Sequence, residues 1–446
     1  MNRALRAPAW LAGRLSEFAS RVLPSSFTMA VVLTAMAMLL AVFWAGASPG
    51  TVVAGWGDGF FSLLSFSMQM ALMLFCGSLL ASTRVVQRLL EAVASLATTP
   101  RRAVALTALC SMLLATLNWA LSLVGSALLV RAIARRQPRA DYRLLVACAY
   151  FGMGATWHAG LSASAPLLVA TPGHFLESRW GLIPVSQTLF SPFNLLLLGA
   201  TVAGLTALAV LLHPVDGQEL RVDPVLLVDA KTQYTGGQEH GVWLDRQRWM
   251  SLGFGALALA WAVGRFRSSG WRAIDLNTVI LLTFALAVVL HRTPAQLLSA
   301  SESAASTLGG IVLQFPLYAG IYGVFRASGL TERIGEVFVS LCTTRTFPGV
   351  VYLYSGLVNY FVPSGGSKWA IEAPYLLEAA HRLGVVPAKV VLAYAWGDMA
   401  TDLVQPFWAL PLLAVARLDF KDLFGFLGVA FLVYFPLVAM AFFAWG

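Results

Sequence analysis

Apolar residues in this sequence gather in long runs, and short segments that carry most of the charged residues separate these runs. A helix that crosses the hydrocarbon core of a bilayer needs about 20 apolar residues. A shorter run is found at 249–264. The runs long enough to cross are 27–47, 60–82, 190–212, 273–291, 306–325 and 422–445. This pattern predicts an all-α polytopic membrane protein.

Further apolar stretches are interrupted by polar residues, Gly or Pro. They are 103–130, 144–172, 348–385 and 388–416. Arginines precede and follow 103–130, and segments rich in Lys and Arg stay in the cytoplasm. We therefore expect 103–130 to enter the membrane and return as a re-entrant hairpin that bends near Asn118. A second re-entrant hairpin is expected at 348–385, and broken helices are expected at 144–172 and 388–416.

Two polar segments flank these stretches. Residues 1–26 contain four arginines, which places the N-terminus in the cytoplasm. Apolar residues in this segment recur on one helical face, so we expect a short amphipathic helix on the membrane surface. The segment 213–248 is the only long polar stretch, and it is predicted to be a cytoplasmic linker.

The two halves of the chain repeat each other at a spacing of about 240–245 residues. Asn118-Trp119 matches Asn359-Tyr360, and Ala149-Tyr150 matches Ala393-Tyr394. The order of these matches predicts a first repeat at 1–212 and a second at 249–446. The expected orientations give the repeats opposite topology, and inverted repeats with paired broken helices are typical of secondary transporters.

The composition excludes a soluble protein. Of the 446 residues, 58% are apolar and 11% are charged, whereas about 25% are charged in an average soluble protein. The four cysteines lie in or beside apolar runs without CxxC spacing, so we expect core residues. The net charge of +9 indicates a basic membrane face. Nucleic-acid binding is not expected, because the arginines lie between apolar runs.

Polar residues inside the apolar stretches are candidates for a functional site, because such residues are costly in a membrane. Gly365 and Gly366 allow backbone amides to approach a ligand closely. A helix that begins at this turn would direct its positive end at a carboxylate, and nearby hydroxyls could bond to it. The candidate substrate-binding residues are Asn118, Ser122, His158, Ser162, Asn359, Ser364, Gly365, Gly366, Ser367 and Gln405. The candidates for a coupling-ion or charge network are Lys368, Glu372, Asp398, Thr401 and Asp402.

Within these sets, Asp398 and His158 are the candidate proton carriers, because their charge can change during a transport cycle. Lys368 is expected to pair with Asp402 or Glu372, since a single buried charge is expensive. No metal site is expected apart from Na⁺ at the hairpin tips. Residues 365–368 lack the spacing of a phosphate-binding loop, so no cofactor is expected.

Other interpretations of these residues stay open. Ser and Thr in membrane helices often bond to their own backbone, and His158 can equally be a hydrogen-bonded structural residue. A channel would need a continuous polar pore, whereas the polar residues gather near the midplane. An intramembrane enzyme would need a nucleophile beside a base, for which a Ser364–Lys368 pair is the candidate.

Several motifs resemble those of the short-chain fatty acid transporters, and the likeness covers nearly the whole chain. The motifs are Leu117-Asn118-Trp119, Asp141-Tyr142-Arg143-Leu144-Leu145, Trp157-His158-Ala159-Gly160-Leu161-Ser162, Ala170-Thr171-Pro172-Gly173-His174, Val362-Pro363-Ser364-Gly365-Gly366, Ala395-Trp396-Gly397-Asp398 and Gln405-Pro406-Phe407-Trp408-Ala409-Leu410-Pro411. The resemblance implies a bacterial inner-membrane carrier of acetoacetate and butyrate-like acids. It also implies an elevator-type ion transporter fold, whose members are often homodimers.

The chain departs from that family's pattern at charged positions. Lys368 and Glu372 stand where glutamines are usual, and Asp402 stands where an asparagine is usual. A fixed ammonium at 368 could take the place of a coupling cation. We therefore expect secondary active transport of small monocarboxylates by alternating access, with H⁺ or Na⁺ as the coupling ion. The alternative is a carrier for another small organic anion.

Overall fold

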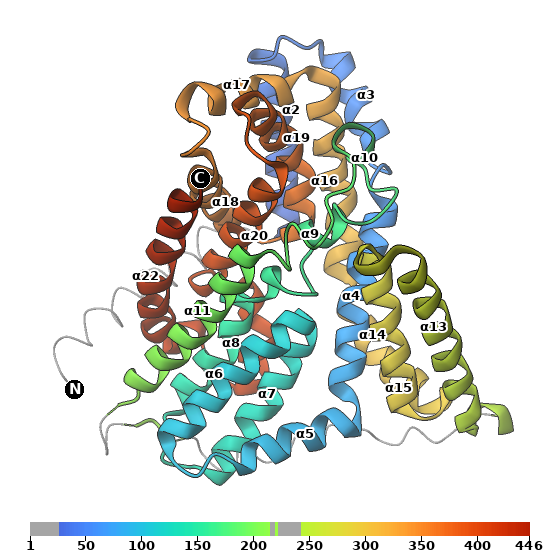
Figure 1. Ribbon diagram of the computed structural model, residues 1–446, viewed down its shortest axis with the longest axis vertical. Helices are drawn as coiled ribbons and strands as arrows, with labels where there is room; N and C mark the ends of the chain where they lie inside the picture. The colour runs from blue at the N-terminus through green and yellow to red at the C-terminus, as the bar shows by residue number, and fades with distance from the viewer. Residues whose placement is uncertain (1–25, 215–218, 222–241) are drawn as a thin grey trace.

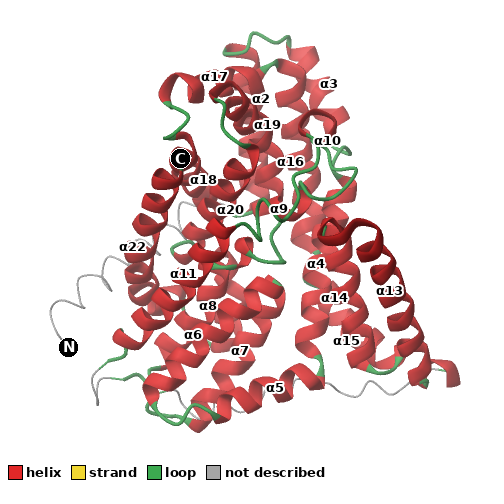
Figure 2. Cartoon of the chain, viewed as in Figure 1, coloured by secondary structure: helices red, strands yellow, loops and turns green. Residues whose placement is uncertain are grey.

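The computed structural model describes residues 26–214, 219–221 and 242–446. The amphipathic helix expected within 1–26 and most of the linker expected at 213–248 lie outside these described residues. Within them, the chain is built from helices and loops and contains no strand (Figure 2).

The part of the chain before residue 215 contains most of the first predicted repeat. Its helices are α2 (Ser26–Phe43), α3 (Pro49–Gly59), α4 (Leu64–Ser82), α5 (Arg84–Ser95), α6 (Pro100–Leu117), α7 (Trp119–Arg136), α8 (Tyr142–Ala155), η1 (Trp157–Ala159), α9 (Ala165–Leu168), α10 (Glu177–Trp180) and α11 (Pro192–Leu211).

The part after residue 241 contains a second series. Its helices are η2 (Trp243–Arg246), α13 (Arg248–Ser269), η3 (Gly270–Ala273), α14 (Leu276–His291), α15 (Pro294–Ala305), α16 (Gly309–Ser328), α17 (Leu330–Leu341), α18 (Phe347–Phe361), α19 (Gly365–Leu383), α20 (Pro387–Ala400), η4 (Thr401–Leu403), η5 (Phe407–Ala409), α21 (Leu410–Ala416) and α22 (Phe420–Trp445).

Among the described residues, 5 helices are long and apolar enough to cross a membrane: α4, α6, α11, α13 extended by η3, and α22. Together, α15 and α16 would make one more span, bent by 54°. The runs expected at 27–47 and 273–291 form the shorter apolar helices α2 and α14. By contrast, α13 continues to Ser269, well past the expected end at 264. The amphipathic helix α5 lies outside the apolar runs, so hydropathy did not predict it.

Helices from distant parts of the sequence lie side by side (Figure 1). On one side of the molecule, α13 packs on α14, and both α14 and α15 pack on α4. On the other side, α6 packs on α7, α8 and α11. At the end opposite α5, α2 and α3 pack on α16. Because α20 also contacts α8, η1 and α9, the two halves of the sequence share one core.

Two helix pairs turn back at polar residues. Between α6 and α7 the only break is Asn118, whose Oδ1 accepts hydrogen bonds from the amides of Ala120 and Leu121, at 2.9 and 3.0 Å. Residues 362–364 separate α18 from α19. The first pair extends to Arg136, past the expected end at 130, because Ala132, Ile133 and Ala134 are buried and continue the helix.

The two other interrupted stretches also break as short helices. After α8, the chain forms η1 and α9, and after α20 it forms η4, η5 and α21. In each case a glycine brings the intact part close to the neighbouring helix pair. A Cβ at Gly152 of α8 would lie 2.9 Å from Cβ of Ala115 on α6, and one at Gly397 of α20 would lie 3.0 Å from the carbonyl carbon of Tyr352 on α18.

Glycines also allow α3 to lie directly on α16. A Cβ at Gly59 would lie 2.6 Å from Cα of Gly323 and 2.7 Å from the carbonyl oxygen of Ala319. Small residues permit this close packing between membrane helices, where lipid offers no hydrophobic drive for association.

We predict that Gly59→Ala destabilises the protein by about 1–3 kcal/mol, because the added methyl group overpacks the α3–α16 contact. Gly57→Ala on the same helix is the matched control, because its Cβ meets nothing within 4 Å. Both changes share the gain in helix propensity. Thermal unfolding of the purified variants in detergent measures the difference. Equal melting temperatures would contradict the packing argument.

Candidate functional site

Four ionisable side chains meet in the interior, where η1, α19 and α20 come together. Lys368 and Glu372 lie on α19, Asp398 lies on α20, and His158 lies on η1. Each is at most 1% exposed. A group of charges this deeply buried is costly unless its members compensate one another. We call these four residues the charge cluster.

Lys368 pairs with Asp398. Its Nζ lies 3.0 Å from Oδ1 of Asp398 and 3.9 Å from Oε1 of Glu372, one turn along α19. Two hydrogen bonds from Nζ go to the carbonyl and hydroxyl oxygens of Ser355, at 2.8 and 2.7 Å. The ammonium also lies 4.5 Å from the centre of the Tyr394 ring. Oxygens and an aromatic face therefore surround this cation.

The expected pairing of Lys368 is confirmed for Glu372, at 3.9 Å, and is wrong for Asp402, whereas the closest acidic partner is Asp398, at 3.0 Å. Asp402 lies beyond the end of α20 and accepts a hydrogen bond from Nδ2 of Asn359 at 2.9 Å. Glu372 is a neighbour of Lys368 but lies farther from it than Asp398 does. The reason is the packing of α20 against α18 and α19, which turns Asp398 toward the ammonium.

Both ring nitrogens of His158 are hydrogen-bonded, and Nδ1 joins the charge cluster. Nδ1 lies 2.8 Å from Oδ2 of Asp398, and Nε2 lies 2.9 Å from the hydroxyl of Ser164. The backbone amide of Ala165 donates to Nε2 at 3.2 Å. Because an N–H can only donate, Nε2 is the acceptor nitrogen, and Nδ1 carries the hydrogen that points at Asp398. His158 is thus neutral in this arrangement.

A second polar group lies beside the end of α20. Nδ2 of Asn359 donates to the hydroxyl of Thr401 at 3.2 Å as well as to Asp402. The Thr401 hydroxyl in turn donates to the carbonyl oxygen of Gly356 at 2.9 Å. These bonds connect the end of α18 to η4, so Asn359, Thr401 and Asp402 are brought together as one unit.

The start of α19 approaches the cluster closely through its backbone. A Cβ at Gly365 would lie 2.6 Å from Oδ2 of Asp398 and 2.6 Å from the Trp157 ring, so only glycine fits there. A Cβ at Gly366 would lie 3.0 Å from the Phe66 ring. Ser364 and Ser367 are hydrogen-bonded to each other through their hydroxyls. Residues 364–367 therefore form one turn of backbone at the start of α19.

The remaining predicted site residues use their side chains for local structure. Nδ2 of Asn118 donates to the Met73 carbonyl at 3.1 Å. Ser122 donates to the Ser111 carbonyl at 2.7 Å, Ser162 donates to the Ala115 carbonyl at 2.7 Å, and Gln405 accepts from the Phe407 amide at 3.1 Å. Their role in substrate binding stays a prediction.

Three contributing residues were missed in the sequence analysis. Ser355 and Tyr394 each lie four positions before a predicted site residue, Asn359 and Asp398, so helical spacing could have found them. Asn194 on α11 is a buried amide in an apolar run, which is itself a signal. It donates to the Ala159 carbonyl at 3.0 Å and accepts from Trp396 Nε1 at 2.8 Å.

Aromatic rings from both halves of the sequence lie next to the cluster. The Trp157 ring stacks on His158 with centroids 4.2 Å apart. Trp119, at the start of α7, lies 6.5 Å from Trp157 and 5.3 Å from Trp408. The charge cluster and a wall of aromatic rings are therefore adjacent.

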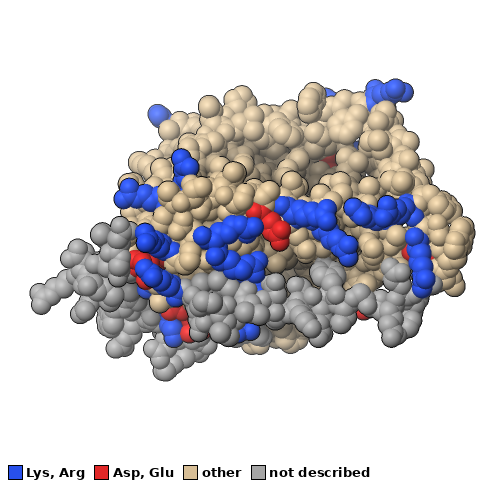
Figure 3. All heavy atoms as spheres, turned by 90° about the horizontal axis from the view of Figure 1, so that it is seen from below, with Lys and Arg blue, Asp and Glu red and all other residues tan. Residues whose placement is uncertain are grey.

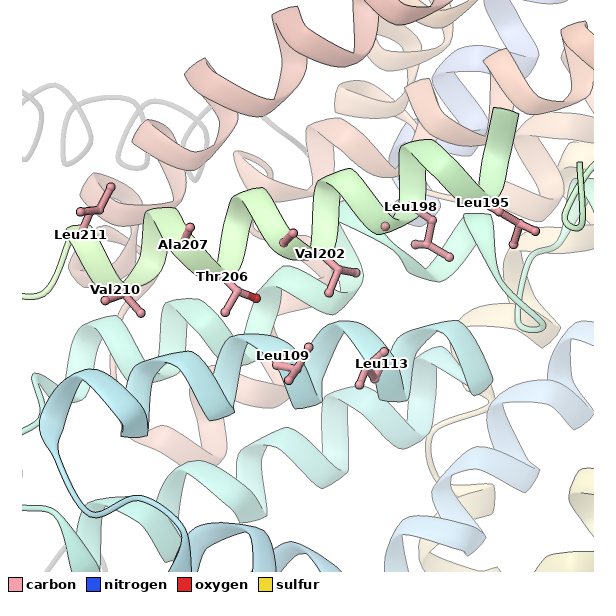
Figure 4. A pocket seen from close by; sticks show the side chains of 11 residues that line it. Leu109, Leu113, Leu195, Leu198, Val202, Thr206, Ala207, Val210 and Leu211 are labelled. Carbon is pink, nitrogen blue, oxygen red and sulfur yellow. The ribbon is translucent and has the colours of Figure 1, made fainter. Parts of the chain in front are cut away.

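A separate groove of about 850 Å³ runs between α6 and α11 (Figure 4). Leu109, Leu113 and Val202 are among the side chains that line it, and Thr206 is the only polar one in this lining. The groove has no cation and so does not suit a carboxylate. Among the described residues, no group of three His, Cys, Asp or Glu side chains is placed to hold a metal ion.

We predict that Lys368→Met and Asp398→Asn each destabilise the protein by about 3–5 kcal/mol, because each leaves a buried partner uncompensated. The double variant should lose less than the sum of the two single losses, since residues in contact are energetically coupled. This double-mutant cycle is measured by unfolding the unmodified protein, the two single variants and the double variant in detergent. Additive losses would show that the two side chains are independent.

The chain is similar to known transporters along nearly its full length. A sequence profile of the family described as "Short chain fatty acid transporter" matches residues 9–444. A protein of Escherichia coli (strain K12) named "Putative short-chain fatty acid transporter" is 39% identical over 415 residues, or 92% of this chain and 94% of that protein. A protein of the same name from Haemophilus influenzae is 33% identical over 433 residues, or 95% of this chain and 96% of that protein.

Among solved structures, the crystal structure of the Alcanivorax borkumensis YdaH transporter is similar to 94% of this chain and 98% of its own, with a TM-score of 0.59 at 15% sequence identity. A likeness at this identity shows a shared fold. The family match and the two relatives show more: this chain belongs to the short-chain fatty acid transporter family and is a membrane transporter, not an enzyme.

Proposed function

We propose that this protein carries short-chain fatty acids, or closely related small monocarboxylates, across the bacterial inner membrane by secondary active transport. The observation that carries the proposal is the buried charge cluster beside the start of α19, in a chain of this family. A carboxylate needs a cation and N–H donors at such a depth. Lys368 and the backbone at Gly365 supply these groups together.

The surroundings of the cluster suit a short acyl chain. Three tryptophans from different segments lie beside the cluster: Trp157 in η1, Trp119 at the start of α7 and Trp408 in η5. The Trp119 ring lies between the other two and next to both of them. An apolar tail of a few carbons can pack on these rings while its carboxylate faces Lys368. A longer chain would have to extend past the rings, so the wall favours small acids.

The paired hairpins and broken helices support alternating access by an inverted repeat. Gly152 and Gly397 hold corresponding positions in the two halves, and each seats a broken helix against the adjacent helix pair. Transporters with such repeats bind substrate at the interface between them. An elevator-type movement and a homodimer follow from the resemblance to ion-coupled carboxylate carriers. The coupling ion is H⁺ or Na⁺.

The distribution of basic residues supports a cytoplasmic N-terminus. Figure 3 shows Lys and Arg side chains in a band across the face seen from below, which is the end of the molecule where α5 lies. The amphipathic helix α5 carries Arg84 and Arg88. Positive segments stay in the cytoplasm, so this face is assigned to the cytoplasmic side.

Another small organic anion is the alternative substrate class, because Lys368 and Glu372 place charges beside the site where the resemblance implies neutral side chains. A channel is disfavoured by the same cluster. All four of its members are at most 1% exposed, whereas a pore would leave such groups in contact with water.

We predict that liposomes containing the purified protein accumulate radiolabelled butyrate or acetoacetate under an imposed pH or Na⁺ gradient. Asp398→Asn should reduce accumulation to the level of protein-free liposomes, because it removes the negative charge that pairs with Lys368. Protein-free liposomes also measure the passive entry of undissociated acid, which must be subtracted.

Asp58→Asn is the matched control, since Asp58 is exposed on α3 and should leave uptake unchanged. Uptake by Asp398→Asn equal to that of the unmodified protein would remove the cluster from the mechanism. Absence of uptake of either acid by the unmodified protein would contradict the substrate class and favour the alternative anion.

A further inference from the structure

Glu372 is the least compensated member of the charge cluster. It is 1% exposed, and neither of its carboxylate oxygens has a hydrogen-bond partner among the described residues. The nearest cation is the Lys368 ammonium, 3.9 Å from Oε1, and that ammonium already pairs with Asp398 at 3.0 Å. A buried carboxylate in this position is costly as an anion and inexpensive as a neutral acid.

The other buried acids near the cluster have donors. Oδ2 of Asp398 accepts a hydrogen bond from His158 at 2.8 Å, and Oδ1, which has no hydrogen-bond partner among the described residues, forms an ion pair with the Lys368 ammonium at 3.0 Å. The negative charge of Asp398 is therefore stabilised in place. Asp402 has the amide of Asn359. Asp398 and His158 are the proton carriers expected from the sequence, but Asp398 is held by both His158 and Lys368. Glu372 alone can lose its charge without leaving a donor unsatisfied.

Several groups face Glu372 from the helices around it. The charged groups that act on it are Lys368 on its own helix and Asp398 on α20. Three tyrosines also lie within its electrostatic reach: Tyr354 on α18, Tyr375 on α19 and Tyr394 on α20. Their hydroxyls are already engaged, because Tyr354 and Tyr375 bond to each other at 2.9 Å and Tyr394 donates to the Gly365 carbonyl at 2.7 Å.

We propose that Glu372 is the proton-carrying residue and that the coupling ion is H⁺, an inference that rests on the proposed function. Lys368 fills an oxygen-lined position with its own ammonium, at 2.7 and 2.8 Å from Ser355 and 3.0 Å from Asp398. A Na⁺ ion would need oxygens of this kind. With them occupied by a fixed cation, the titratable group left to couple transport is Glu372.

The charges of the cluster explain how the proton and substrate would travel together. Lys368 and Asp398 cancel each other, and His158 is neutral. A bound monocarboxylate adds one negative charge near Lys368, and this charge favours the protonated form of Glu372. One proton from the entry side binds a carboxylate oxygen of Glu372 as the substrate anion binds. The same proton dissociates to the exit side when the substrate leaves.

The test compares net accumulation with exchange, because exchange of labelled for unlabelled substrate requires no net proton movement. With one proton per monocarboxylate, a pH gradient of about one unit supports about tenfold accumulation, since each unit is worth about 1.4 kcal/mol. We expect Glu372→Gln, which imitates the protonated acid, to lose this accumulation and to retain exchange. A Na⁺ gradient without a pH gradient should drive no accumulation in the unmodified protein.

Glu378→Gln is the matched control. Glu378 lies on the same helix, but it is paired with Arg179 at 2.6 Å and Arg382 at 2.9 Å, away from the cluster. This variant should keep both activities. Glu372→Asp, which preserves a carboxyl group, should also keep accumulation driven by the pH gradient.

Three results would overturn the proposal. The first is that Glu372→Gln still accumulates substrate, the second is that a Na⁺ gradient alone drives accumulation, and the third is that Glu372→Gln loses both exchange and accumulation. The last would place Glu372 in substrate binding or in folding. If Glu372→Gln is not recovered folded, the ion dependence of the unmodified protein decides the question. Absence of exchange in the unmodified protein would instead remove the proposed function itself.

Discussion

The cost of a charge inside a membrane governs the centre of this protein. Lys368 must have an acidic partner where it lies, because an isolated ammonium there would be strongly unfavourable. Asp398 provides that partner at 3.0 Å, and Ser355 takes two hydrogen bonds from the same nitrogen. These contacts connect α18, α19 and α20, so the packing of three helices around the site follows from one cation.

Backbone approach is the second condition of the site. Gly365 brings the first turn of α19 against Asp398 and Trp157, and no larger residue fits there. Unwound backbone is tolerated at membrane depth where protein surrounds it. The chain satisfies the polar groups of its helix ends with capping side chains, such as Asn118, whose Oδ1 accepts hydrogen bonds from the first amides of α7. The break before α19 therefore places backbone directly against the buried charge of Asp398.

Much of the helical pattern could be predicted from the sequence, because hydropathy and charge report on burial in lipid. The breaks at Asn118 and at 362–364 lie within the stretches where interruptions were expected. Glu372 was a predictable partner of Lys368, because it lies one turn along the same helix. The closer partner, Asp398, could not be predicted, since its position depends on how α20 is rotated against α19. A run of apolar residues does not reveal α5, because its apolar residues recur periodically on one face of the helix. Ser355 was missed because a Ser hydroxyl on a helix is often bonded to its own backbone.

Asn194 has a consequence for movement within the molecule. Its amide group accepts a hydrogen bond from the indole of Trp396 in α20 and donates one to the carbonyl of Ala159 in η1, so one side chain of α11 binds segments from both halves of the sequence. A displacement that shifted η1 without α20 would break at least one of these bonds, at about 0.5–1.5 kcal/mol each. Asn194 thereby links η1 mechanically to the intact helix α20. Any rigid body that contains both segments is therefore defined by side-chain contacts between distant parts of the sequence.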